Sequence, residues 1–235
     1  MSEINNSCFE GFSAKTFEFL MGLEINNSKI WFEENKSIYR EYVVKPFQEL
    51  VKALASHMLA IDPEFDIRAD IGKTISRIYR DVRFSKDKSP YRSSVWITFK
   101  KMNRDWKLDP CFFFEITPSI YRYGMGFYTA SKESIKRLRE LIDEESNDFN
   151  ELNSLYKSQN IFTLEGEKYK KVLDKSKSPE ILEWYQRKNI YFMCTKKINE
   201  KLFDSELLDE IIRGFDIMKP FYEFLWKLKI EGEKI

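Results

Sequence analysis

The segment CFFFEITPSIYRYGMGFY, residues 111–128, decides the fold class. Prolines at 110 and 118 bound its first run of aromatic and aliphatic residues, and a second aromatic-rich run follows at 120–128. Such runs between breakers are typical of strands, and the short connection predicts that the two pair antiparallel. Upstream, apolar and polar residues alternate over 75–84 and again over 94–99, which predicts two more strands. The sequence therefore predicts an antiparallel meander sheet over about residues 75–128.

Helical patterns flank this sheet on both sides. Apolar residues recur at helical spacing before it, with Pro46 in the first turn of a third helix and with Asn26 and Asn27 forming a turn and a cap. After it, Ser178-Pro179 begins a short helix, a further strand is expected near 190–194, and Pro220 is expected to kink or split the last helix. We predict an α+β fold: the meander and the later strand, packed by N-terminal and C-terminal helices in one compact domain over 1–235.

The composition argues against several classes of protein but does not identify a function. Hydrophobic residues make up 43% and aromatic residues 16% of the 235-residue chain, enough for a substantial core. The net charge of +1 does not suit a protein that coats DNA generally. The N-terminus lacks the features of a signal peptide, and no apolar run approaches a membrane span, so we expect a soluble, cytoplasmic protein with no membrane partner.

The residue types also argue against several kinds of site. Three distant cysteines (Cys8, Cys111 and Cys194) favour buried thiols over disulfides or zinc, and the one histidine, His57, favours a surface or packing role. No phosphate-binding glycine motif is present, and Gly124 and Gly126 indicate a bulge or a close approach of two backbones more than a phosphate cradle. We therefore predict no metal and no cofactor, and the oligomeric state is left open.

The most charged stretch is RIYRDVRFSKDKSPYR, residues 77–92, called the basic segment below. It carries six cations and two carboxylates, a local charge of +4. Two interpretations compete. In the first, which the sequence favours, internal ion pairs account for the charges and fix a strand and turn. In the second, surplus cations bind an anion, to which the planar fork of an arginine is well suited.

Strand parity divides the basic segment into two faces. Arg80 falls on the apolar face with Ile78, Val82 and Phe84, while Arg77, Tyr79, Asp81 and Arg83 share the other face. A cation on an apolar face needs a partner, and Glu115 stands in the apolar strand 111–117 with the same need. The sequence thus predicts an Arg80–Glu115 ion pair.

Three long motifs carry a resemblance to a known family. They are GFSAKTFEFLMGLEINNSKIWFEENKSIYREYVVKPFQELV, the basic segment, and FFFEITPSIYRYGMGFY. Together they resemble the bacterial and fungal family called domain of unknown function 2461, whose RDxRFSKDKSPY core is intact at residues 80–91. The resemblance implies a cytosolic α+β domain and marks the basic segment as the family signature, but it implies no activity.

Three functional hypotheses follow. In the first, the chain is a binding module for a phosphorylated small molecule or a short nucleic-acid stretch. Its candidate ligand-binding residues are Arg77, Arg80, Arg83, Lys86, Lys88 and Arg92, with Tyr91 as an aromatic wall and Asp81, Asp87 and Glu115 as supporting carboxylates. In the second, the chain is a metal-free enzyme using Asp81 or Glu115 as acid or base with arginine stabilisers. In the third, it is a structural or partner-binding protein whose basic segment only fixes the fold.

Overall fold

The computed structural model describes residues 9–83, 86–102 and 107–234. The chain divides into two compact units, each assembled from three stretches of sequence. The first unit comprises Met1–Phe99, Phe113–Tyr123 and Thr195–Arg213. The second comprises Lys100–Phe112, Gly124–Cys194 and Gly214–Ile235. Several elements contribute residues to both units.

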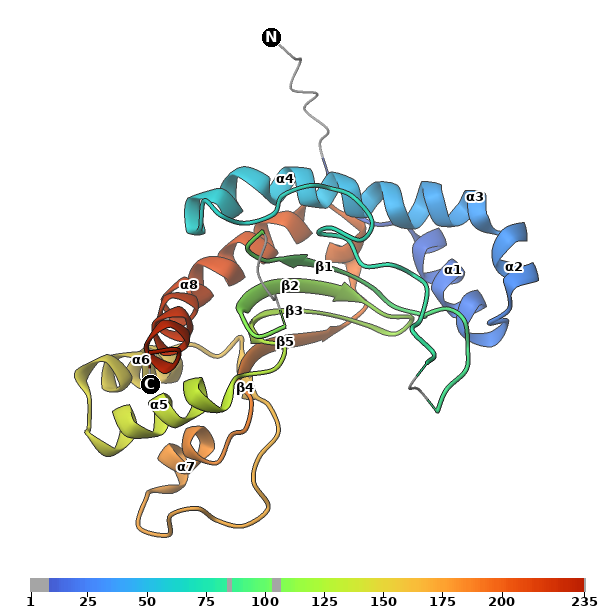
Figure 1. Cartoon of the computed structure of the whole chain (residues 1–235). Helices are drawn as coiled ribbons and strands as arrows, with labels where there is room; N and C mark the ends of the chain where they lie inside the picture. Colours follow the sequence, from blue (N-terminus) through green and yellow to red (C-terminus); the bar gives the residue numbers. More distant parts are fainter. Residues whose placement is uncertain (1–8, 84–85, 103–106, 235) are drawn as a thin grey trace. The chain divides into compact units, whose positions relative to one another are not determined.

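The strands form one antiparallel sheet in the order β1-β2-β3-β5-β4. The first three, β1 (Val95–Phe99), β2 (Pro110–Ile116) and β3 (Ile120–Phe127), make the predicted meander. The later strand β5 (Tyr191–Lys197) adds next to β3, and the short β4 (Thr163–Glu165) lies at the edge, with Leu164 opposite Phe192. The predicted α+β class is confirmed, and Figure 1 shows the sheet with its helices.

The prediction of a regular strand over 75–84 is wrong. That segment runs beside residues 90–98 through isolated bridges, Ile75 with Ile97 and Tyr79 with Tyr91. Backbone bonds from Ser76 N to Trp96 O (2.8 Å) and from Arg80 N to Pro90 O (2.9 Å) hold it there. The pairing has the antiparallel direction that was predicted, but not the continuous ladder of a strand.

Two glycines let β3 and β5 approach each other closely. A Cβ at Gly124 would lie 1.9 Å from Phe192 O, and one at Gly126 would lie 2.3 Å from Tyr191 Cα. Gly126 also has a φ of 155°, which other residues rarely adopt. The glycine pair therefore serves strand pairing, as the sequence indicated.

In the first unit, the helical segment after residue 35 is continuous across Pro46. It consists of α3 (Lys36–Ile38), a π-helical turn η1 (Tyr39–Val44) and α4 (Lys45–Ile61). Pro46 lies in the first turn of α4, as the sequence predicted, but no break separates α4 from η1. Proline has no N–H for the carbonyl four residues earlier, which belongs to Tyr42. That carbonyl instead accepts a 2.5 Å bond from the hydroxyl of Thr16 on α1 (Ala14–Ile25). A buried threonine thus replaces the bond that proline removes.

The core of the first unit is aromatic. Phe12, Phe47 on α4 and Phe114 on β2 form a triangle with ring centroids 4.9 to 6.1 Å apart. All three side chains are buried. Helix α4 packs against β1 (Figure 1), and the short helix α2 (Lys29–Glu34) follows the turn after α1.

The second unit buries Trp184 at its centre. This residue lies on α7 (Pro179–Tyr185), whose N-cap Ser178 accepts a bond from the Ile181 amide, as the sequence predicted. Its indole donates to Asn153 on α6 (Asn147–Ser158) at 3.0 Å. Helix α5 (Lys132–Asp143) also contacts both α6 and α7.

The last helix, α8 (Glu206–Gly232), is one continuous helix with Pro220 inside it, so the predicted split does not occur. Pro220 is exposed, while the neighbouring Phe221 and Tyr222 are buried. The proline therefore removes its hydrogen bond on the solvent side of the helix. None of the described helices has the length and apolarity needed to cross a membrane.

Candidate functional site

The basic segment keeps the two faces predicted by parity, although it is not a regular strand. Ile78 is buried and Arg80 half-buried, whereas Arg77, Tyr79 and Asp81 are exposed. Phe84, predicted on the inner face, lies outside the described residues. The backbone hydrogen bond from Arg92 N to Ile78 O (2.8 Å) places Arg92 opposite Ile78 in the paired segment. Tyr79 is the exception to this sorting, because it pairs with the buried Tyr91 and its ring also lies near Phe32.

Tyr91 anchors the basic segment in the core of the first unit. Its ring stacks on Phe32 with centroids 4.3 Å apart, and the residue is only 1% exposed. Burial raises the pKa of its hydroxyl. Tyr91 therefore lies in the core and does not form the aromatic wall of a ligand site that the sequence suggested. Among the described residues of the segment, the exposed aromatic side chain is that of Tyr79, at 56%.

Asn27 fixes the backbone of Tyr91 from 64 residues away. Its amide nitrogen donates to Tyr91 O and its amide oxygen accepts from Tyr91 N, both at 3.0 Å. The helix cap that the sequence assigned to this region is instead Ser28, whose hydroxyl accepts from the Trp31 amide. Asn27 thus pairs with Tyr91 as a neighbouring strand would.

Asp81 and Arg83 form an ion pair on the outer face. The Arg83 guanidinium donates from Nε at 3.0 Å and from Nη2 at 2.7 Å to the two carboxylate oxygens of Asp81. These bonds lower the pKa of Asp81 to about 2. A carboxylate with so low a pKa is a weak base at neutral pH.

Arg80 pairs with Asp87, not with Glu115 as the sequence predicted. Nη1 of Arg80 lies 2.6 Å from Oδ2 of Asp87, across the turn of the basic segment. Asp87 also accepts from the amide and hydroxyl of Ser89, bonds that lower its pKa together with the charge of Arg80. The turn brings a carboxylate to Arg80 from within its own segment.

Glu115 has a nearer partner in Arg122. The hairpin between β2 and β3, closed by the bond from Thr117 N to Ile120 O, sets the two side chains beside each other. Nε of Arg122 donates to Oε2 of Glu115 at 2.5 Å. Glu115 therefore belongs to the sheet and is not a supporting carboxylate of Arg80.

The remaining cations of the basic segment have no carboxylate partner among the described residues. Lys88 donates to the Val82 carbonyl at 2.8 Å, and the Arg92 guanidinium lies over the Trp96 ring, 5.0 Å from its centroid. Arg77 and Lys86 are exposed. The segment thus uses both of its carboxylates internally and still retains positive charge.

The cysteines give no indication of a metal site. Cys111 and Cys194 are buried thiols that are not joined in a disulfide, and burial raises the pKa of the Cys111 thiol to about 12. Cys8 lies outside the described residues. Over the described ranges, no group of three or more His, Cys, Asp or Glu side chains is placed to hold a metal ion.

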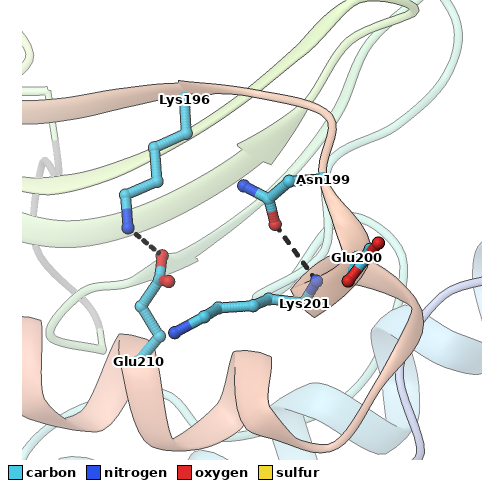
Figure 2. A pocket seen from close by; sticks show the side chains of 5 residues that line it. All are labelled: Lys196, Asn199, Glu200, Lys201 and Glu210. Atoms are coloured by element: carbon cyan, nitrogen blue, oxygen red, sulfur yellow. Dashed lines mark hydrogen bonds and ion pairs between the residues drawn. The ribbon is translucent and has the colours of Figure 1, made fainter.

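A second polar site, which the sequence analysis did not predict, lies in the first unit. It is a pocket of about 470 Å³ lined by Lys196, Asn199, Glu200, Lys201 and Glu210. Figure 2 shows these five side chains. Glu210 is only 7% exposed. The sequence does contain a signal for it, because a glutamate stands between Leu207 and Ile211 on the buried face of α8.

Comparison with known families places the chain in one of them. A family model described as a conserved hypothetical protein, DUF2461, matches residues 15–224. No curated protein matches the chain. The match spans both units and contains the whole basic segment and the residues of the second pocket. The chain therefore belongs to the DUF2461 family of conserved hypothetical proteins.

Proposed function

We propose that the protein is a binding module whose basic segment holds a phosphate-type anion. The observation that carries the proposal is a pair of buried donors. Nε of Arg80 and Nε of Arg92 are both buried, and neither has a hydrogen-bond partner among the described residues. A buried N–H without an acceptor costs roughly 1–3 kcal/mol, which an anion that accepts from it would offset.

Backbone pairing supports a shared role for these two arginines. Because Tyr79 pairs with Tyr91, Arg80 lies opposite residue 90 and Arg92 lies opposite Ile78. Arg80 and Arg92 are therefore diagonal neighbours on one face, a spacing within reach of long side chains. Two guanidinium groups at that spacing suit the several oxygens of a phosphate.

The charges around the pair favour binding over acid–base catalysis. Asp81, the candidate base, is held by Arg83 with a pKa of about 2, and Glu115 is held by Arg122. The exposed Arg77 and Lys86 lie in the same segment and add positive charge that attracts an anion.

Calorimetric titration with inorganic phosphate tests the proposal. We expect saturable binding that Arg92→Gln weakens roughly tenfold or more, as loss of a charge-assisted bond implies. Lys52→Gln, which removes an exposed cation from α4, is the matched control and should bind as the wild type does. Absence of binding, or equal binding by both variants, would refute the proposal.

A second titration separates the two ligand sources. If the physiological ligand is a short nucleic-acid stretch, an oligonucleotide should bind more tightly than phosphate, with affinity falling steeply as salt rises from 50 to 200 mM. If the ligand is a phosphorylated small molecule, the oligonucleotide should bind no better than phosphate does.

The structural role is the second candidate, and the internal ion pairs favour it. The Arg80–Asp87 and Arg83–Asp81 pairs fix the turn without any ligand. If this is the only role of the segment, Arg80→Gln should lower the melting temperature, and no variant of the segment should bind phosphate differently. An unchanged melting temperature for Arg80→Gln would count against the structural role.

A further inference from the structure

The pocket beside α8 is built around a buried carboxylate that neighbouring side chains hold in place. Oε1 of Glu210 accepts from the Tyr121 hydroxyl at 3.2 Å and from Nζ of Lys196 at 2.9 Å. The Tyr121 hydroxyl in turn accepts from the Asn199 amide at 3.1 Å. Side chains of β3, β5, the turn before η2 (Glu200–Phe203) and α8 thus converge on one carboxylate.

The fixed carboxylate still offers an acceptor. Both of its bonds involve Oε1, and Oε2 has no partner among the described residues. Figure 2 shows Lys196 and Lys201 both extending toward Glu210 across the pocket. The nearest carboxylate contact of Lys201 is with Glu206, 3.7 Å away, which is too long for a hydrogen bond. The pocket therefore presents one acceptor and a largely uncommitted ammonium group.

We propose that this pocket binds a small anion that also carries a hydroxyl group, such as a sugar phosphate or a hydroxy acid. The anionic group pairs with Lys201, and the hydroxyl donates to Oε2 of Glu210. The volume of about 470 Å³ lies within the usual range for small-molecule sites. This site shares no residue with the basic segment and is independent of the function proposed for it.

The position of Lys196 favours a hydroxyl over an ammonium group as the ligand group that donates to Oε2 of Glu210. Its Nζ lies 2.9 Å from Oε1 of Glu210, so it already neutralises that carboxylate. An ammonium group on Oε2 would stand next to the like charge of Lys196, which is unfavourable. A neutral hydroxyl makes the same hydrogen bond without that repulsion, so amino acids and other zwitterions are disfavoured.

Calorimetry with four small probes tests this inference. Glycerol 3-phosphate combines both groups, inorganic phosphate and glycerol carry one each, and phosphoethanolamine replaces hydroxyls with an ammonium. We expect glycerol 3-phosphate to bind this pocket with one molecule, in addition to any molecule that the basic segment holds, and each of the other three probes to bind this pocket at least tenfold more weakly. No saturable binding of glycerol 3-phosphate, or equal affinity for phosphoethanolamine, would overturn the proposal.

Variants assign the binding to this pocket. Lys201→Met should weaken glycerol 3-phosphate binding roughly tenfold or more, since it removes a charge-assisted bond. Lys197→Met is the matched control, because Lys197 is the exposed neighbour of Lys196 on β5 and does not line the pocket. Equal binding by both variants would contradict the assignment.

Two further variants test where glycerol 3-phosphate binds and what drives its binding. One distinguishes this pocket from the basic segment, and the other distinguishes recognition of the hydroxyl group from simple charge attraction. Arg92→Gln, which tests the basic segment, should leave glycerol 3-phosphate affinity unchanged here; a loss would assign the binding to the basic segment. Glu210→Gln should abolish the preference for glycerol 3-phosphate over phosphate while retaining binding of both. If Glu210→Gln unfolds, Lys201→Met still decides, because Lys201 lies on the surface.

Discussion

At the scale of single residues, Asn27 shows how one side chain can replace a strand. Its amide pairs with both backbone groups of Tyr91, at 3.0 Å each, and Tyr91 carries the end of the basic segment into the aromatic core. Without this amide, two backbone groups near the core would lose their partners. The position of the basic segment therefore depends on a residue far outside it.

Replacing Asn27 by alanine should lower the free energy of unfolding by roughly 1–3 kcal/mol, because backbone N–H and C=O groups of Tyr91 are left unpaired. Urea denaturation measures the loss. Asn26→Ala is the control, since Asn26 is exposed and its side chain bonds only to Gly22 O, within its own turn. An equal effect of the two substitutions would show that Asn27 acts only as a turn residue.

The Asp81–Arg83 pair predicts a pH dependence. The pKa of Asp81 is about 2 in the folded protein against 3.8 ordinarily, so its ionised form is favoured by folding. The resulting stabilisation is present above about pH 4 and is lost as the pH falls toward 2. A carboxyl carbon NMR titration should give the low pKa in the wild type and a higher pKa in Arg83→Gln, which loses the side-chain bonds but keeps the backbone bond of residue 83. A wild-type value near 3.8 would mean that the pair does not persist in solution.

The sequence predicted the exposure of the basic residues better than their partners. Strand parity correctly separated Ile78 and Arg80 from Arg77 and Asp81, since alternation needs only local geometry. Parity predicted an ion pair between Glu115 and Arg80. In the structure, the β2–β3 hairpin places Glu115 beside Arg122, and the turn of the basic segment places Asp87 beside Arg80. Partners depend on register and turn geometry, which residue patterns do not specify.

At the scale of elements, two prolines lie within continuous helical segments. Pro46 is tolerated because Thr16 bonds the carbonyl it leaves unpaired. Pro220 is tolerated because it faces solvent, where water bonds the freed carbonyl. The prediction that Pro46 lies in the first turn of a helix is confirmed, although that helix continues from η1 without a break. The predicted split at Pro220 does not occur, because α8 continues through it.

Pro220→Ala should stabilise the protein by about 1–3 kcal/mol, because alanine restores a backbone hydrogen bond within α8 and has the higher helix propensity. Thermal and urea unfolding measure the gain. The exposed Glu223 lies on the same helix, and Glu223→Ala should change stability little. A destabilised Pro220→Ala variant would indicate that the bend at Pro220 is needed for packing.

The strand predicted over 75–84 shows the limit of periodicity. Alternating burial identified the correct faces, yet the segment forms only isolated bridges with residues 90–98. Alternation reports which side chains are covered, not whether every backbone group is paired. The strands with continuous ladders, β1, β2 and β3, are those that combine alternation or apolar runs with flanking breakers.

At the scale of the whole molecule, the division into two units does not coincide with breaks in the elements. β2, β3, β5 and α8 each contribute residues to both units. If one unit unfolded alone, each of these elements would lose the part that belongs to that unit, together with the backbone hydrogen bonds of that part. We therefore expect the chain to unfold in one cooperative transition, which would support the predicted single domain.

Two single-tryptophan variants test this expectation. One retains Trp96 in the first unit and the other retains Trp184 in the second. Their fluorescence should report the same urea midpoint within error. Midpoints that remain separated after correction for the stability of each variant would show that the units unfold independently.

The sequence predicted the fold class and the meander but not the full strand order. The meander follows from short connections, whereas β5 beside β3 and β4 at the edge depend on contacts between distant segments. The second pocket depends on the same contacts, because Tyr121 and Lys196 meet at Glu210 only once these strands are assembled. A lone glutamate in an apolar stripe was the sole sequence signal.

The π-helical turn η1 has a consequence for insertions and deletions. A π-turn accommodates one residue more than an α-helix of the same length. Deleting one residue from Tyr39–Val44 would therefore leave a regular α-helix and keep the helical segments before and after it in nearly the same rotational position. The ring contacts of Tyr39 with Phe19 and Phe32 would then be largely retained. Homologues with one residue fewer in this stretch should therefore still have these three aromatic residues.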